Sequence, residues 1–250
     1  MISIINYINN KREKRKLLND VMFKSLCDYF NLSRTEGLKV ASVDKWSPTP
    51  IHEYFNNLDD FSEENVMRGW GIDQYRALRN WYYHRNDDFK WLIEGMAIEI
   101  NDDILDYGCS TSFFSYYCMK NNIKIKISLA DVESPHFNFC KVFYKDFAQE
   151  FIEIKPRLLP LEKQYTKIIL YDVLEHVPSP LKVCGHMNDH LIQGGRLLET
   201  FIQDVEFKNR SNLRSAIEER ESTFEFLSDH FNLVSGEKGS HPGPRIWEKK

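Results

Sequence analysis

The chain has 250 residues, 42% of them hydrophobic, which is enough for one large α/β domain or for such a domain with a helical extension. Its formal net charge of −4 gives no global electrostatic case for nucleic acid as a partner. The five cysteines form no Cys-x-x-Cys pair and no apolar run reaches membrane-spanning length, so we expect no zinc site, no disulfide framework, no membrane partner and a cytoplasmic location.

The first 100 residues show helical rather than strand-like patterning, and we assign residues 1–100 to a helical N-terminal cap region. A stripe of apolar residues predicts a helix over Lys11–Phe30, and a short helix is expected over Ile51–Leu58. Gly37 and the segment Ser47–Pro50 interrupt the pattern.

Aromatic residues are concentrated in the second half of this region. They either pack the helices onto the rest of the protein or line a ligand pocket, and the two roles are compatible for different faces of one helix. The candidates for a substrate pocket are Trp70, Tyr75, Trp81, Tyr83 and His84.

From residue 101 the pattern changes to alternating strands and helices, and we assign residues 101–250 to a second domain. The predicted strands are Asp103–Tyr107, Ile123–Ala130, Phe151–Ile154, Lys167–Tyr171, Arg196–Ile202, Phe231–Ser235 and Arg245–Lys249. The predicted helices are Ser112–Asn121, Pro135–Gln149, Pro180–Leu191 (stopped by Gly194 and Gly195) and Asn212–His230. Strands that are separated by helices predict a doubly wound, mostly parallel, seven-stranded α/β sheet.

Three strand ends carry the candidate chemistry, because ligands of such sheets lie outside the carboxyl ends of the strands. The first strand ends at Asp106 and enters a loop of small residues, Gly108–Ser112, where a ligand can approach the backbone before a helix begins. The second strand ends at Asp131, 23 residues after Gly108, a position from which a carboxylate binds ribose hydroxyls. The fourth strand ends at Asp172.

Four segments in this order resemble the motifs of class I S-adenosylmethionine-dependent methyltransferases. They are Leu105–Ser112, Leu129–Asp131, Asp172–Val177 and Leu191–Leu198. The resemblance covers residues 100 to 250 approximately and implies a Rossmann-like methyltransferase domain with S-adenosylmethionine as its cofactor. The sequence departs from the family where Ser110 and Ser112 replace the usual glycines, and no acidic residue matches the one often found near adenine after the third strand.

The resemblance also implies roles for individual residues. Asp106 and the backbone around Gly108 would hold the methionine part, Asp131 the ribose and Val132 the adenine, while Asp172 and Val173 would lie beside the sulfonium. The full set that it assigns to the cofactor is Asp106, Gly108, Cys109, Ser110, Ser112, Asp131, Val132, Asp172 and Val173.

We expect methyl transfer to an O or N atom of a small-molecule acceptor, and the aromatic cap favours an apolar or aromatic one. His176 is the candidate general base by its position after the fourth strand, and a capping role for this histidine is the equal alternative. The expected partner is the acceptor, and a second copy of the chain in a homodimer is left open.

Two alternatives remain open at this stage. Asp172, Glu175 and His176 resemble the metal-binding motif of RNA 3′-terminal 2′-O-methyltransferases, although we expect no metal because the same short pattern occurs in methyltransferases that bind none. The serines of the cofactor loop are also compatible with a non-catalytic binding protein of the same fold. A Rossmann dehydrogenase is disfavoured because only Gly108 of its Gly-x-Gly-x-x-Gly fingerprint is present.

Overall fold

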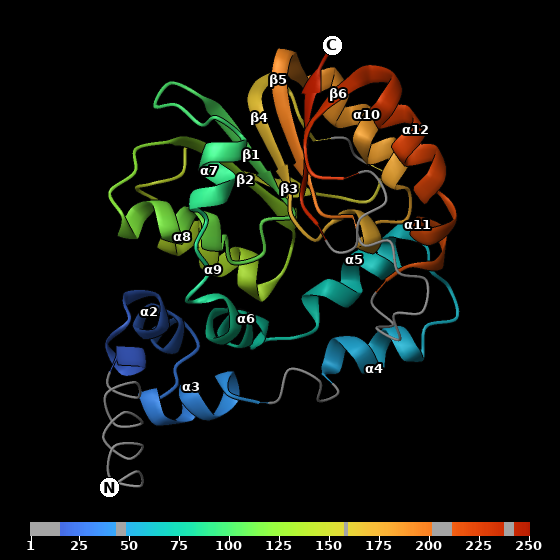
Figure 1. The fold of residues 1–250 in the computed structure, drawn as a ribbon. Coiled ribbons are helices and arrows are strands. Elements are labelled where there is room, and N and C mark those ends of the chain that lie inside the picture. Colours follow the sequence, from blue (N-terminus) through green and yellow to red (C-terminus); the bar gives the residue numbers. More distant parts are fainter. Residues whose placement is uncertain (1–15, 44–48, 158–159, 202–211, 238–242) are drawn as a thin grey trace, which may run out of the picture.

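The computed structural model describes residues 16–43, 49–157, 160–201, 212–237 and 243–250, and their centre is one seven-stranded sheet (Figure 1). Its strands are β1 (Asp103–Tyr107), β2 (Lys126–Val132), β3 (Glu150–Ile154), β4 (Tyr165–Leu170), β5 (Leu191–Glu199), β6 (Phe231–Ser235) and β7 (Arg245–Lys249). They lie in the order β3-β2-β1-β4-β5-β7-β6. The first five pair in parallel, and β7 runs antiparallel to both β5 and β6. A seven-stranded α/β fold is therefore confirmed, in the form of a mixed sheet.

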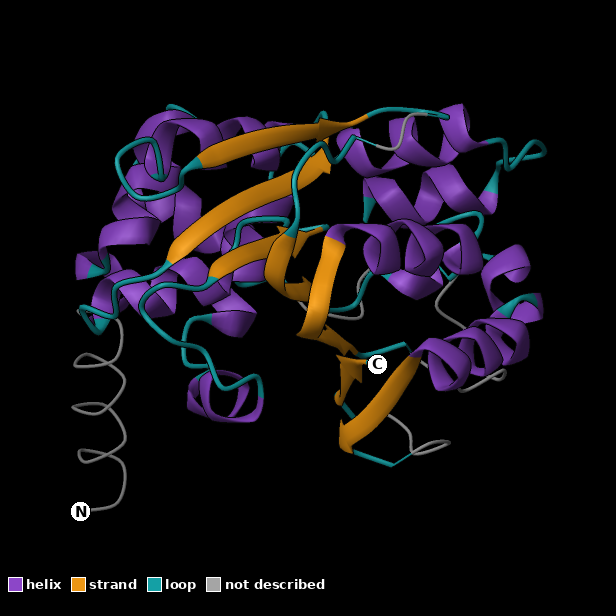
Figure 2. Ribbon diagram, turned by 90° about the horizontal axis from the view of Figure 1, so that it is seen from above, coloured by secondary structure: helices purple, strands orange, loops and turns teal. Residues whose placement is uncertain are grey.

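Helices cover both faces of the sheet because its central strands are apolar on both sides (Figure 2). Ile104 of β1 belongs to the core beneath α8 (Phe113–Lys120) and α9 (Pro135–Phe143). The next residue, Leu105, belongs to the opposite core. That second core lies beneath α10 (Pro180–His190), α11 (Arg214–Glu218) and α12 (Arg220–His230).

Six described helices precede the sheet in the chain. They are α2 (Val21–Tyr29), α3 (Arg34–Ala41), α4 (Pro50–Asn56), α5 (Glu63–Gly71), α6 (Arg76–His84) and α7 (Lys90–Gly95). Figure 1 shows α4, α5 and α6 across one end of the sheet. This end holds the carboxyl ends of the parallel strands, since Trp70 of α5 contacts His176, which follows β4. The helices α4, α5 and α6 thus lie over the edge where a ligand is expected (Figure 1).

The helices α4 and α5 cover the outer strands of the sheet, where the connection between β3 and β4 supplies no helix among its described residues. Residues 155–157 and 160–164, the described part of the connection from β3 to β4, contain no helix that could cover the outer strands. Ile51 and Phe55 of α4 and Val66 of α5 instead pack into one core with Ile152 and Ile154 of β3. Both cores are therefore shared between helices before β1 and the sheet, and the division of the chain at residue 100 stays a prediction.

Several predicted boundaries are wrong near the N-terminus. The helix predicted over Lys11–Phe30 is interrupted at Asp20, whose carboxylate accepts a hydrogen bond from the Phe23 amide (3.0 Å) and caps α2; residues 11–15 lie outside the described residues. Gly37 does not break a helix but lies inside α3, where a side chain would collide with Cys27 of α2.

Other corrections concern the second half of the chain. The helix predicted over Pro135–Gln149 ends at Phe143, and the one over Asn212–His230 divides at Glu219. Gly194 and Gly195 do not stop a helix but lie inside β5. The reason is a bulge: Leu191 pairs with Tyr165 and Arg196 with Lys167, so the four residues 192–195 of β5 lie opposite the single residue Thr166 of β4. No helix in the described ranges is both long and apolar enough to cross a membrane.

Candidate functional site

The loop between β1 and α8 forms the base of the candidate site. Gly108 has a φ of 74° and lies against the loop that follows β4, since a Cβ here would lie 2.6 Å from Val173 Cγ2. The amides of Gly108 and Cys109 both donate to the Ala130 carbonyl of β2, at 2.8 and 3.0 Å. The ends of β1, β2 and β4 therefore meet at this loop, next to the switch point between β1 and β4.

Ser110 and Ser112 adopt the left-handed backbone conformation, with φ of 51° and 45°. This region costs a residue with a side chain about 1–2 kcal/mol, which explains why glycine would suit both positions. The Ser110 hydroxyl accepts from the Asn80 amide of α6 (3.1 Å), while the Ser112 hydroxyl donates to Asp106 (2.7 Å). Serine therefore adds hydrogen bonds that glycine could not make.

Asp106 is a buried carboxylate at the end of β1, with an exposed fraction of 6%. In the part of the chain that the structure describes, no cation lies within ion-pair distance of the Asp106 carboxylate. Its hydrogen-bond donor, the Ser112 hydroxyl, carries no charge. Burial raises the pKa of Asp106 to about 7, which the Ser112 hydroxyl opposes and the nearby charge of Asp131 reinforces. A positively charged ligand group would restore its ionised form.

Asp131 at the end of β2 is buried as well, and its side chain contacts the β1–α8 loop. Its carboxylate accepts from the amides of Ser110 (2.5 Å) and Val132 (2.7 Å). Burial raises the pKa of Asp131 to about 6, although these amides and the charge of Arg76 favour the ionised form. A carboxylate has about four lone-pair positions, so two remain for a ligand.

Asp172 after β4 is also in the left-handed conformation, with a φ of 52°. Its amide donates to the Thr200 hydroxyl (2.6 Å), which in turn donates to the Asp172 carboxylate (2.8 Å). Thr200 directly follows β5, the neighbour of β4, so the register of the two strands brings this pair together. The Thr200 side chain holds Asp172 in the left-handed conformation, which the backbone alone disfavours.

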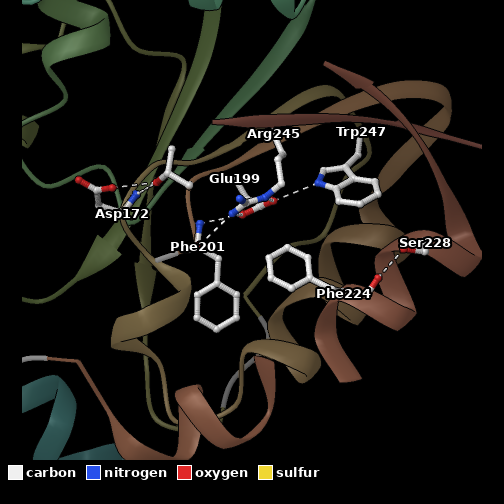
Figure 3. A network of polar contacts seen from close by, with 8 residues as sticks. Asp172, Glu199, Phe201, Phe224, Ser228, Arg245 and Trp247 are labelled. Carbon is white, nitrogen blue, oxygen red and sulfur yellow. Dashed lines mark hydrogen bonds and ion pairs between the residues drawn. The ribbon is translucent and has the colours of Figure 1, made fainter. Parts of the chain in front are cut away.

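A buried ion pair anchors the neighbouring end of β5 (Figure 3). Arg245 of β7 donates to both carboxylate oxygens of Glu199, at 2.5 and 2.9 Å, and the Trp247 indole donates to one of them at 3.1 Å. The Phe201 amide completes the set at 2.7 Å. Both charged side chains are fully buried, so this network is a rigid support beside the Asp172–Thr200 pair.

His176 and Trp70 form the contact between helix α5 and the loop after β4. The two rings lie 4.7 Å apart in an edge-to-face arrangement, and the Arg76 guanidinium lies over the Trp70 ring, 4.5 Å from its centre. Arg76 also interacts electrostatically with Asp131 at the end of β2. The contacts from Arg76 to Trp70 and from Trp70 to His176 therefore extend from the end of β2 to the loop after β4.

The other predicted pocket residues lie in different surroundings. Trp81 has no exposed surface, because it stacks on Phe23 (4.4 Å) and donates to Asp20 (2.9 Å). The Tyr83 hydroxyl donates to the Val43 carbonyl, and Tyr75 packs against Phe30 (5.7 Å).

His84 pairs with Asp87 (2.7 Å) and contacts Phe113, the first residue of α8 (5.3 Å). The structure thus brings Trp70 to the loop after β4 and His84 to the start of α8, whereas Trp81 belongs to the core. Burial raises the pKa of the Cys109 thiol well above its usual value, so this cysteine is not a thiolate.

The acid-x-x-Glu-His segment does not bring three ligands together. Glu175 is fully buried, and neither of its carboxylate oxygens has a hydrogen-bond partner among the residues that the structure describes. Burial, with the charge of Asp172 as a smaller cause, raises the pKa of Glu175 to about 8, so it is protonated at neutral pH. Within the described ranges no three His, Cys, Asp or Glu side chains are grouped as a metal site requires.

Sequence reasoning missed four residues of this region: Arg76, Asn80, Glu199 and Thr200. Glu199 carried a readable signal, since it is a charged residue at the end of an apolar strand and therefore needs a buried partner. No sequence signal identifies the other three residues, Arg76, Asn80 and Thr200, because their contacts depend on how distant elements pack.

No family model and no curated protein matches this sequence. Among solved structures, the MccD protein is similar at a TM-score of 0.48 and 15% identity, over 65% of this chain and 96% of that one. The N-methyltransferase NodS from Bradyrhizobium japonicum WM9 is similar at 0.44 and 12%, over 59% and 85%. The [4+2]-cyclase SpnF is similar at 0.47 and 15%, over 60% and 58%. At TM-scores below 0.5 these resemblances assign no activity to the chain.

Proposed function

We propose that this protein is an S-adenosylmethionine-dependent methyltransferase that acts on an O or N atom of a small-molecule acceptor. The observation that carries the proposal is Asp106, a buried carboxylate without a cationic partner among the described residues, at the base of the β1–α8 loop. The ammonium group of the cofactor's methionine part would supply the missing positive charge. Asp131 and Asp172, at the ends of β2 and β4, supply two further polar groups around the same loop.

Four residues of this chain would suit the cofactor. Asp106 would bind the ammonium group, and the two remaining lone-pair positions of Asp131 would accept from the ribose hydroxyls. Val132 would flank the adenine, and Val173, which touches Gly108, would lie beside the methionine part. These roles follow the motif resemblance position by position.

The bound cofactor would supply an activated methyl group, so the chain's main task is to align the acceptor with it. The Trp70 and His176 rings contact each other at the loop after β4, and these two side chains are the proposed acceptor contacts. His176 would accept a proton from the acceptor where the reaction releases one. The Thr200 hydroxyl would keep Asp172 in its left-handed conformation during this step.

The test of the cofactor assignment is the affinity for S-adenosylhomocysteine, measured by calorimetry on the wild type and on Asp131→Ala. We expect the variant to bind at least about tenfold more weakly, because it loses hydrogen bonds to a charged group. Asp103→Asn, at the opposite end of the β1 strand, is the matched control. Equal affinities of Asp131→Ala and the wild type would remove the ribose assignment.

A further inference from the structure

Arg76 is a cation of the cap that neither the motifs nor the proposed catalytic roles use. It is the first residue of α6, and its guanidinium lies over the ring of Trp70, 4.5 Å from the ring centre. Because Trp70 contacts His176, the cation lies at the carboxyl ends of the parallel strands, above the candidate site.

Within the described part of the chain, the Arg76 guanidinium has no anionic partner in contact with it. No carboxylate oxygen of the described residues lies within 4.0 Å, and its buried Nε has no hydrogen-bond partner. Asp131 attracts it only from a longer distance, and the carboxylate oxygens of Asp131 accept from the Ser110 and Val132 amides instead. A desolvated cation without a partner is costly, and a bound anion would remove that cost.

The groups around Arg76 do not neutralise it. His136, at the start of α9, is 3% exposed, and its Nδ1 has no hydrogen-bond partner in the described ranges. The positive charge of Arg76 is near enough to act on the His136 ring. Burial lowers the pKa of His136 to about 3, so the ring is neutral at physiological pH. Burial also lowers the pKa of Arg76, but only to about 10, so the guanidinium stays charged. One positive charge therefore lies over Trp70 with its buried Nε unpartnered among the described residues.

We propose that Arg76 binds an oxyanion, a carboxylate or a phosphate, carried by the ligand of this site. A planar guanidinium that is already held against an indole ring is suited to bind such a group through two parallel hydrogen bonds. The group belongs either to the cofactor, as the carboxylate of its methionine part, or to an acidic acceptor. Only this choice of ligand rests on the proposed function.

Three probes distinguish the two sources: S-adenosylhomocysteine, 5′-methylthioadenosine, which lacks the amino-acid part, and inorganic phosphate. Each is titrated by calorimetry into the wild type and into Arg76→Gln, and phosphate is titrated both with and without S-adenosylhomocysteine. Arg68→Gln is the matched control, because Arg68 lies on the neighbouring helix α5 and is exposed.

A cofactor carboxylate on Arg76 predicts that Arg76→Gln weakens S-adenosylhomocysteine at least about tenfold and leaves methylthioadenosine unchanged. An acidic acceptor predicts that both nucleosides bind normally, while phosphate binding to the S-adenosylhomocysteine complex is lost. If the wild type binds no S-adenosylhomocysteine, the proposed function fails, yet loss of phosphate binding in Arg76→Gln would still establish the oxyanion site.

The proposal is overturned if folded Arg76→Gln binds all three probes within twofold of the wild type. Should this variant not fold, Arg76→Lys decides, because it keeps the charge and the stem but not the planar fork. We expect Arg76→Lys to lose at least about threefold in oxyanion affinity, and full affinity would contradict the proposal.

Discussion

The pH dependence of cofactor binding follows from the two buried carboxylates. Burial raises the pKa of Asp106 to about 7 and that of Asp131 to about 6 in the ligand-free protein. If Asp106 binds an ammonium group and Asp131 ribose hydroxyls, the ligand prefers the ionised form of both. The affinity for S-adenosylhomocysteine should therefore rise with pH and level off above about pH 7.

The size of the effect follows from the fraction of each group that is ionised. At pH 5 about one Asp106 in 100 and about one Asp131 in ten is ionised, so the affinity at pH 5 should be up to about 1,000-fold lower than at pH 8, or about 4 kcal/mol. Unfolding does not cause this loss. Both folded-state pKa values lie above the usual 3.8, so these groups stabilise the folded state relatively more as pH falls from about 7 to 4.

The assay is calorimetric titration with S-adenosylhomocysteine between pH 5 and pH 8, in two buffers of different ionisation enthalpy so that released protons are counted. Asp106→Asn should bind weakly at pH 8 and keep only the part of the pH dependence below pH 6. Asp103→Asn, on the same strand, should behave as the wild type. A wild-type affinity that varies less than threefold over this range would refute the assignment of both carboxylates.

Three further predictions concern stability, measured by urea unfolding. Glu175→Gln should be more stable than the wild type by up to about 3 kcal/mol at pH 7 and equally stable near pH 4. The reason is that the folded-state pKa of Glu175 is raised to about 8, so the wild type loses stability as the pH rises from about 4.5 to 8. A stability difference that does not change with pH would contradict this. Arg245→Ala should cost about 3–5 kcal/mol, since it leaves Glu199 buried and unpaired, and a loss below about 1 kcal/mol would show that the pair does not anchor β5. Trp81→Ala should also cost about 3–5 kcal/mol, whereas Trp70→Ala should cost clearly less because Trp70 is half-buried; similar losses would mean that both rings belong to the core.

The elements that the sequence predicted well are those with a local signal. β1, β6 and β7 were predicted with their observed bounds, because short apolar or alternating runs between turn residues identify a strand without knowledge of its neighbours. The start of α9 at Pro135 was equally readable from the proline. In the candidate site, Asp106, Asp131 and Asp172 were found because each lies near the carboxyl end of a predicted strand or directly after it.

What the sequence did not predict depends on contacts between distant segments. The bulge at residues 192–195 follows from the pairing of β5 with β4, and the Asp172–Thr200 contact depends on the same register. Arg76 reaches the site only because α5 and α6 lie over the strand ends. Helical periodicity alone could not separate Trp81, in the core, from Trp70, next to His176.

The most direct test of the account is titration of the wild-type protein with S-adenosylhomocysteine at pH 8, with NAD⁺ as the comparison nucleotide. The structure and the motifs together predict one bound S-adenosylhomocysteine per chain and no binding of NAD⁺. Failure of the folded protein to bind S-adenosylhomocysteine would contradict the assignment of Asp106, Asp131 and the β1–α8 loop to this cofactor.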